Sequence, residues 1–330
     1  MSILTPTLTS LKTLSTTPKT ILITGSSSGI GHATTVLLST LNPSHNLILV
    51  DLTPPPSSLT HAASNVLHCT CDITSWTAQR AAFAQGKAKF GRIDYVFANA
   101  GISEDGDQFF AEKVDGEGEL AGPGGKTLGV DLEGLVMTVK LAIYYLRRND
   151  DDAGGEGGGR RGRGGIVLTA SLAGYLGTAG MHMYSAAKHG VVGLMRALKH
   201  ECRALGIAVS VVAPAVTATP LILATDGSTV KRVEGNGEGM VDEHARVLRK
   251  GGVTVNRVES VALAVCWLWE QGLAASGMGV LVQNDRFVDL ERGLMKNRDV
   301  WMGREALEDF QGGKRSEAFG GEQKGGKAKI

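Results

Sequence analysis

The stretch TILITGSSSGIGHATTVLLSTL, residues 20–41, decides the fold class of this 330-residue chain. A short apolar run leads directly into a glycine-rich turn, which is followed by apolar residues at helical spacing. In a strand-turn-helix unit the glycines let the backbone approach a phosphate, and the helix N-terminus offers unpaired N–H groups. A glycine-rich turn can also be a plain connection, so neighbouring motifs must decide. The predicted cofactor-binding residues of this turn are Gly25, Ser27, Gly29, Ile30 and Gly31.

Further short β-branched runs follow, separated by longer segments of helical period. They cover residues 47–51, 66–69, 93–98, 166–170, 208–213 and 279–282. Together with residues 21–24 they predict an α/β fold: a single Rossmann-type, doubly wound domain with a seven-stranded parallel sheet over residues 19–290. Ligands of such sheets bind beyond the carboxyl ends of the strands, so residues at strand ends are the functional candidates.

Four segments fall outside this pattern. Residues 1–18 are interpreted as a flexible N-terminal extension, although the absence of acidic residues also faintly matches a targeting peptide. Residues 104–126 and 149–165 are rich in Gly and charged residues, which predicts polar surface insertions. Residues 291–330 form a C-terminal segment that we expect to be disordered beyond about residue 312.

Composition narrows the class of partner. The chain has 34 Lys plus Arg against 33 Asp plus Glu, so no basic excess favours nucleic acid, and a small-molecule partner is expected. The most apolar stretch, residues 261–269, is far shorter than the roughly 20 residues that span a bilayer, so no membrane span is predicted. The four cysteines lack disulfide density and paired spacing, which predicts a cytoplasmic location and no metal.

Asp51 indicates the cofactor. It ends the second predicted strand twenty residues after Gly31, where a carboxylate can accept both adenosine ribose hydroxyls. The same carboxylate repels a 2′-phosphate, and neither Arg nor Lys occurs in residues 26–28 to offset that repulsion. The sequence therefore predicts NAD, with NADP disfavoured.

Two further strand ends carry polar residues that could flank the adenine and the ribose. Asp72 follows the third predicted strand, and Asn99 follows the fourth. An Asp in this position is equally well explained as the N-cap of the next helix, here expected from Thr74. Both roles stay open for Asp72.

Tyr184 and Lys188 are four residues apart at the head of a predicted helix, so their side chains share one face. Such a pair is common by chance. It gains meaning from Ser171, which ends the preceding strand thirteen residues before Tyr184. A phenol ordinarily keeps its proton up to about pH 10, and a neighbouring ammonium favours its ionised form.

Over roughly residues 20–282 the chain closely resembles the short-chain dehydrogenase/reductase family. The resemblance is carried by TGSSSGIG, Asp51, NAG, Ser171, YSAAK and APAVTATP. The resemblance implies that Tyr184 is the catalytic acid/base, that Lys188 favours its ionised form and holds ribose, and that Ser171 orients the substrate oxygen. Val216 and Thr219 would hold the nicotinamide carboxamide. Residues 286–303 weakly resemble prostaglandin-dehydrogenase-like and fungal biosynthetic members.

The chain departs from the family pattern in two places. Ala215 stands where Gly usually follows the proline, which is a mild change. Asp131 stands where Asn usually serves the proton relay to the lysine. An ionised Asp cannot donate a hydrogen bond. Asp131 either keeps the relay through its backbone carbonyl or titrates with Lys188, or else it weakens activity. The predicted catalytic residues are Ser171, Tyr184, Lys188 and Asp131; Tyr184 and Lys188 also count as cofactor-binding.

These motifs predict an NAD(H)-dependent oxidoreductase that interconverts a secondary alcohol and a ketone. Residues 217–252 are expected to cover a medium-sized, fairly apolar substrate, and secondary metabolism is the expected setting. His182 either faces this pocket or packs as an ordinary histidine. The alternative is an NAD-binding redox sensor or scaffold with weak turnover. Apolar faces on residues 127–148 and on the helix with Tyr184 predict a homodimer or homotetramer.

Overall fold

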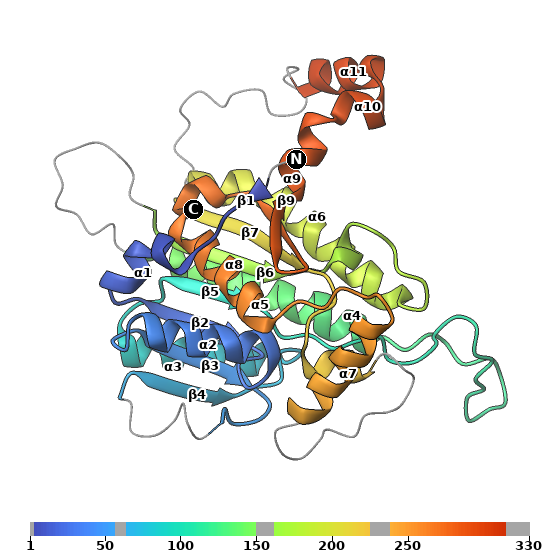
Figure 1. Ribbon diagram of the computed structural model, residues 1–330, viewed down its shortest axis with the longest axis horizontal. Helices are drawn as coiled ribbons and strands as arrows, with labels where there is room; N and C mark the ends of the chain where they lie inside the picture. The colour runs from blue at the N-terminus through green and yellow to red at the C-terminus, as the bar shows by residue number, and fades with distance from the viewer. Residues whose placement is uncertain (1–2, 57–63, 150–161, 225–237, 315–330) are drawn as a thin grey trace.

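The computed structural model describes residues 3–56, 64–149, 162–224 and 238–314 (Figure 1). Its core is a nine-stranded sheet with the strand order β1-β9-β8-β7-β6-β5-β2-β3-β4. The strands are β1 (Ile3–Leu4), β2 (Thr20–Thr24), β3 (Asn46–Asp51), β4 (Val66–Thr70), β5 (Tyr95–Ala98), β6 (Gly164–Thr169), β7 (Ile207–Pro214), β8 (Gly279–Gln283) and β9 (Arg286–Asp289).

The seven strands β2 to β8 are parallel and match the seven runs expected from the sequence. The chain builds the sheet outward from β2 to β4 and then returns to place β5 on the other side of β2. Such a reversal, here between the carboxyl ends of β2 and β5, is the place where a doubly wound sheet forms the crevice that binds its ligand.

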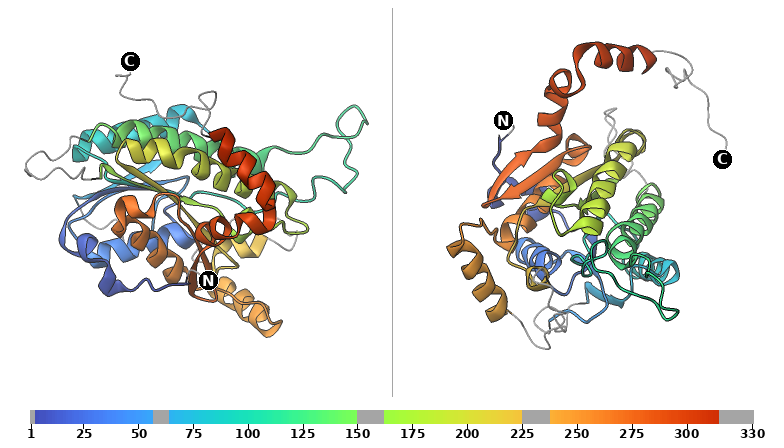
Figure 2. Two further views of the ribbon diagram at one scale, coloured as in Figure 1. Left: turned by 90° about the horizontal axis from the view of Figure 1, so that it is seen from above. Right: turned by 90° about the vertical axis from the view of Figure 1, so that its right-hand side faces the viewer.

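Helices cover both faces of the sheet (Figure 2). They are α1 (Lys12–Thr16), α2 (Gly29–Leu41), α3 (Trp76–Phe90), α4 (Lys126–Leu128), α5 (Leu135–Leu146), α6 (His182–Ala204), α7 (Glu238–Lys250), α8 (Val258–Glu270), α9 (Leu290–Lys296), α10 (Arg298–Met302) and α11 (Arg304–Lys314). A π-helical turn, Gly129–Gly134, joins α4 to α5. Short 3-10 turns cover Leu8–Ser10, Leu172–Gly174, Pro220–Ala224 and Gly272–Ala275.

Alternation along the central strands divides the core into two clusters. On β2, Leu22 packs into the cluster beneath α3, α5 and α6, whereas Ile21 and Ile23 pack into the cluster beneath α2 and α8. Strands buried on both faces need apolar residues at consecutive positions, which is why they were recognisable as continuous runs.

The sheet has two more strands than expected. β9 runs antiparallel to β8, and β1 pairs antiparallel with β9. The turn between β8 and β9 holds Asn284 and Asp285 at φ 52° and φ 56°, the left-handed region that Asn and Asp tolerate best among residues other than Gly. Because β1 has only two residues, its identity as a strand depends on pairing with a distant segment.

The N-terminal residues also differ from the flexible extension that we expected. Leu11 and Leu14 are fully buried in the cluster beneath α2 and α8. The Glu270 carboxylate, at the end of α8, accepts hydrogen bonds from the backbone N–H groups of Thr13 at 2.8 Å and Leu14 at 3.2 Å. The segment 3–18 therefore packs against the domain, because its buried leucines contact the apolar residues of α8.

His45 makes the stability of this region depend on pH. Its ring is buried, and Nδ1 accepts a hydrogen bond from the Lys19 N–H at 2.9 Å. Burial, followed by the nearby Lys19 charge, lowers the pKa of His45 from 6.5 to about 4. Since the unfolded chain binds the proton more readily, the free energy of unfolding should fall by up to about 3 kcal/mol as the pH drops from 6.5 to 4.

Urea denaturation at several pH values checks this prediction. His45→Gln, which cannot titrate in this range, should flatten the dependence, while His200→Gln at an exposed position should leave it in place. An unchanged pH dependence in the His45 variant would show that another group is responsible.

The structure describes the first of the two predicted insertions and only the ends of the second. Residues 104–126 form a loop that projects from the body, with an isolated bridge between Val114 and Leu120 (Figure 1). Of residues 149–165, only 149 and 162–165 are described, and Gly164 and Gly165 already belong to β6. The chain beyond 314, which includes most of the stretch expected to be disordered, lies outside the described residues. Every described helix is too short or too polar to cross a membrane.

Candidate active site

The glycine-rich turn lies between β2 and α2, at the crevice. Gly25 has a φ of +67°, and a Cβ added there would lie 2.8 Å from the Cα of Ala100. A Cβ added to Gly31 would lie 2.0 Å from the Gly25 carbonyl oxygen. Both positions therefore require Gly, and their packing brings the N-terminus of α2 close to the turn. Ile30 belongs to the first turn of that helix.

Asp51 lies beside this turn and is held in place by it. Its carboxylate accepts hydrogen bonds from the Ser27 N–H at 3.0 Å and from the Thr53 N–H at 3.1 Å. The Ser27 hydroxyl donates to the Thr53 carbonyl at 2.7 Å, which joins the ends of β2 and β3. The structure thus brings together Ser27 and Asp51, both of which were predicted to bind the cofactor.

Asp72 and Asn99 occupy the neighbouring strand ends. Asp72 accepts from both the N–H and the hydroxyl of Thr74, each at 2.8 Å, while Ser75 is the N-cap of α3 and accepts from the Ala78 N–H. The helix therefore begins later than expected, and Asp72 closes the turn before it. The Asn99 amide donates to the carbonyls of Thr24 and Gly25. Its oxygen accepts from Thr169, so Asn99 ties β2, β5 and β6 at the crevice.

Tyr184, Lys188 and Asp131 meet inside the protein. The Lys188 ammonium is buried and lies 5.3 Å from the centre of the Tyr184 ring. It forms a 2.9 Å ion pair with Oδ2 of Asp131, which is itself fully buried, and donates to the Thr169 carbonyl at 3.2 Å. The sequence had left open whether Asp131 pairs with Lys188, and the structure shows this contact.

The ion pair determines the charge of the lysine. Burial on its own would lower the pKa of Lys188, but the charges of Asp131 and Tyr184 and the hydrogen bond to Asp131 outweigh it and raise the pKa above its usual value. Lys188 is therefore a permanent cation at neutral pH. The second Asp131 oxygen accepts from the Ile102 N–H at 2.7 Å, which links the pair to the turn after β5.

Ser171 lies two residues after the end of β6, at the same edge of the sheet. Its side chain accepts a hydrogen bond from the Ala173 N–H at 3.1 Å and donates to the Pro214 carbonyl at 3.3 Å. Through these contacts it caps the 3-10 turn that leads from β6 towards α6 and joins it to the end of β7.

The segment after β7 returns to the glycine-rich turn. Thr219 is buried, and a Cβ added to Gly29 would lie 3.2 Å from its methyl carbon. The Val216 carbonyl accepts from the N–H of Asn256, a fully buried residue that the sequence analysis missed. The Asn256 amide also donates to the Val282 carbonyl at 2.7 Å. An isolated Asn before a helix carries no sequence signal for this role.

The segment expected to cover the substrate is described only in part, because residues 225–237 lie outside the described ranges. Ile222 and Leu223 pack with Val241, Ala245 and Val255 in a small apolar cluster of their own. His182, the first residue of α6, contacts the rings of Phe109 and Phe110.

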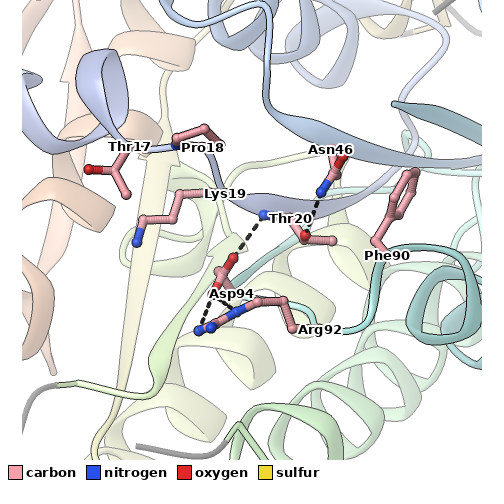
Figure 3. Close-up of a pocket in the computed structure, with 8 residues that line it drawn as sticks. All are labelled: Thr17, Pro18, Lys19, Thr20, Asn46, Phe90, Arg92 and Asp94. Atoms are coloured by element: carbon pink, nitrogen blue, oxygen red, sulfur yellow. Dashed lines mark hydrogen bonds and ion pairs between the residues drawn. The ribbon is translucent and has the colours of Figure 1, made fainter. Parts of the chain in front are cut away.

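A cavity of about 190 Å³ lies at the opposite, amino-terminal edge of the strands (Figure 3). Its polar groups bond to one another: Arg92 and Asp94 form a 2.7 Å ion pair, and Asp94 accepts from the Thr20 N–H at 2.8 Å. The residues that line this cavity therefore connect the beginnings of neighbouring strands, and the cavity is not part of the candidate active site.

The donor set at the crevice fits a nicotinamide dinucleotide. Glycines at positions 25, 29 and 31 keep the turn narrow, the buried Ser26 hydroxyl has no hydrogen-bond partner in the structure, and the Asp51 carboxylate bonds to the Ser27 N–H of the same turn. Among the described residues, no cluster of His, Cys, Asp and Glu could hold a metal ion.

Comparison with known proteins agrees with this geometry. The short chain dehydrogenase family model matches residues 19–226. The chain belongs to the short-chain dehydrogenase family. The family's members bind a nicotinamide dinucleotide cofactor and act on small-molecule substrates. This membership confirms the resemblance seen in the sequence, and the fold is the one that the resemblance implied.

Several short-chain dehydrogenases are similar to the chain. The short-chain dehydrogenase/reductase prx4 of Penicillium roqueforti is 32% identical over 293 residues, which cover 86% of this chain and 80% of that protein. The 5'-hydroxyaverantin dehydrogenase of Dothistroma septosporum is 30% identical over 218 residues, covering 62% of this chain and 69% of that protein. The crystal structure of levodione reductase superposes with a TM-score of 0.58 at 26% identity, covering 81% of this chain and 96% of that chain.

Proposed function

We propose that this short-chain dehydrogenase is an NAD(H)-dependent oxidoreductase that interconverts a secondary alcohol and a ketone. The observation that carries the proposal is the buried arrangement of Tyr184 with Lys188, whose ammonium lies 5.3 Å from the ring centre. A buried cation beside a phenol stabilises its ionised form, so the hydroxyl can release and recover a proton.

Each side chain has one task in this proposal. The Tyr184 hydroxyl gives a proton to the substrate oxygen during reduction and takes it back during oxidation. Lys188 supplies fixed positive charge beside it. The Ser171 hydroxyl, at the same edge, steadies charge on the substrate oxygen. A bound nicotinamide would supply or accept the hydride, and the residues that would hold it are the glycine-rich turn, Asp51, Asp72, Asn99, Lys188, Val216 and Thr219.

The substrate is expected to be medium-sized and apolar. Ile222 and Leu223 follow the cofactor-binding segment after β7 and pack in an apolar cluster. Two of the similar proteins are named for a dehydrogenase acting on 5'-hydroxyaverantin and for a reductase of levodione. These names support a cyclic ketone or alcohol, and a role in secondary metabolism, as the first class to test.

The Asp131–Lys188 ion pair favours a second candidate function, an NAD-binding redox sensor with weak turnover. The carboxylate offsets part of the charge that would otherwise act on Tyr184. A panel of cyclic and aryl ketones, followed by NADH absorbance, separates the two functions. Turnover of any member supports the enzyme, whereas tight NADH binding without turnover supports the sensor.

Asp51 should determine the choice between NAD and NADP. Asp51→Ala removes the negative charge that would face a 2′-phosphate, so the preference for NADH over NADPH should fall by about a hundredfold. Titration of both cofactors, followed by nicotinamide fluorescence, gives the ratio of dissociation constants.

Asp72→Asn is the matched control, because it removes the same charge from a carboxylate that bonds to Thr74 at the next strand end. It should change the affinity for both cofactors alike and leave their ratio intact. Tighter binding of NADPH than NADH by the unaltered protein would contradict the proposed role of Asp51.

We also propose a homodimer or homotetramer in the cytoplasm. Val136 and Tyr144 leave an apolar part of α5 exposed, 40% and 44% respectively, which supports an interface between copies. The four cysteines are all buried and unpaired, which supports a reducing location.

A further inference from the structure

The helix that carries Tyr184 has no cap of its own. α6 begins at His182, and its N-cap residue, Met181, has no side chain that can accept a hydrogen bond. The first N–H groups of a helix have no partner within it and need one from elsewhere. In α6 the N–H groups of Met183 and Tyr184 are among them, so a cap at these positions acts directly on the catalytic tyrosine.

Glu104 supplies the missing cap from a distant part of the chain. Its Oε1 accepts a hydrogen bond from the Met183 N–H at 3.2 Å, and its Oε2 accepts from the Tyr184 N–H at 2.7 Å. A carboxylate at a helix N-terminus is also favoured by the helix dipole. Glu104 lies in the loop after β5, eighty residues before Tyr184.

The same loop is fixed at its other end to the buried ion pair. Asp131 accepts from the Ile102 N–H at 2.7 Å and binds Lys188 at 2.9 Å. Within one short segment, Ile102 therefore bonds to the carboxylate that pairs with Lys188, and Glu104 bonds to the backbone of Tyr184. This arrangement sets the depth of α6 relative to the turn after β5.

Aromatic rings extend this contact along the loop. The Asp107 carboxylate accepts from the N–H groups of Phe109 and Phe110 at 3.0 and 2.9 Å, which turns the chain back towards α6. Both rings then contact the ring of His182, with centroids 5.3 and 5.5 Å apart. The loop thus holds the first three residues of α6 by two independent contacts.

We propose that Glu104 is a positioning residue that fixes the Tyr184 phenol by capping α6 from the loop after β5. The inference rests on the proposed function, since it concerns the same tyrosine. It assigns a role to a residue that the sequence placed in a polar surface insertion.

Glu104→Ala should lower kcat for a ketone of the panel by about tenfold or more, because a small misplacement of a reacting group costs a large part of the rate. The KM for NADH should change little. Hydrogen exchange at the amides of Met183 and Tyr184, followed by mass spectrometry in the protein without cofactor, should become faster.

Two rescues and one control separate positioning from general destabilisation. Glu104→Gln keeps an acceptor oxygen and should retain most of the turnover, and Met181→Asp should restore turnover and slow exchange in the Glu104→Ala background. Ser75→Ala removes the cap of α3 and should leave turnover unchanged.

Unchanged exchange in Glu104→Ala, or a loss of turnover no greater than in Ser75→Ala, would overturn the proposal. Absence of turnover in the unaltered protein would instead contradict the proposed function. The exchange measurement then still decides whether Glu104 holds the helix.

Discussion

Tyr184→Phe is expected to lower turnover of any accepted ketone by about a thousandfold while NADH binding stays within a fewfold of the unaltered protein. The substitution removes the hydroxyl that exchanges the proton and keeps the ring beside Lys188. Steady-state kinetics by NADH absorbance measures the first effect, and a fluorescence titration of NADH measures the second.

Tyr145→Phe is the matched control for this prediction. Tyr145 stacks on Phe83 with ring centroids 5.5 Å apart, in the layer of α3 and α5. The Tyr145→Phe variant also loses a phenol oxygen, and its turnover should be unchanged. If Tyr184→Phe retained more than about a tenth of the turnover, another group would be the proton donor.

Asp131→Ala should have the largest effect on stability. It leaves the buried Lys188 ammonium without its carboxylate, and a buried charge that loses its partner typically costs about 3–5 kcal/mol of the free energy of unfolding. It also removes the acceptor of the Ile102 N–H. Denaturation in urea, with NADH absent, gives this free energy directly.

A double-mutant cycle isolates the ion pair from the rest of this loss. Lys188→Met combined with Asp131→Ala removes both charges, so the double variant should be less destabilised than the sum of the single variants. Additive losses would mean that the pair contributes no coupling. Asp131→Asn should restore the acceptor for the Ile102 N–H and so recover part of the stability lost in Asp131→Ala.

The parallel sheet was predictable because strands covered on both faces need continuous apolar runs, as in residues 21–24 and 47–51. β1 and the packing of Leu11 and Leu14 were not, because a two-residue strand and a five-residue helix are defined by what they contact. The local sequence of a short segment does not indicate which distant segment it packs against.

The candidate site divides in the same way. The glycine-rich turn and the pair of Tyr184 with Lys188 were recognisable from spacing within one turn or one helix. The contact of Asp131 with Lys188 joins residues 57 positions apart, and that of Glu104 with Tyr184 joins residues 80 apart. The sequence left the contact of Asp131 with Lys188 open among alternatives. It gave no sign of the contact of Glu104, which lies in a stretch that predicts a polar surface insertion.

Transfer of deuterium from NADH labelled at the reactive carbon tests the central claim most directly. With a cyclic ketone from the panel, the account predicts an alcohol that carries the label on its carbinol carbon, formed by the unaltered protein and not by Tyr184→Phe. A protein that binds NADH tightly yet labels no member of the panel would contradict it.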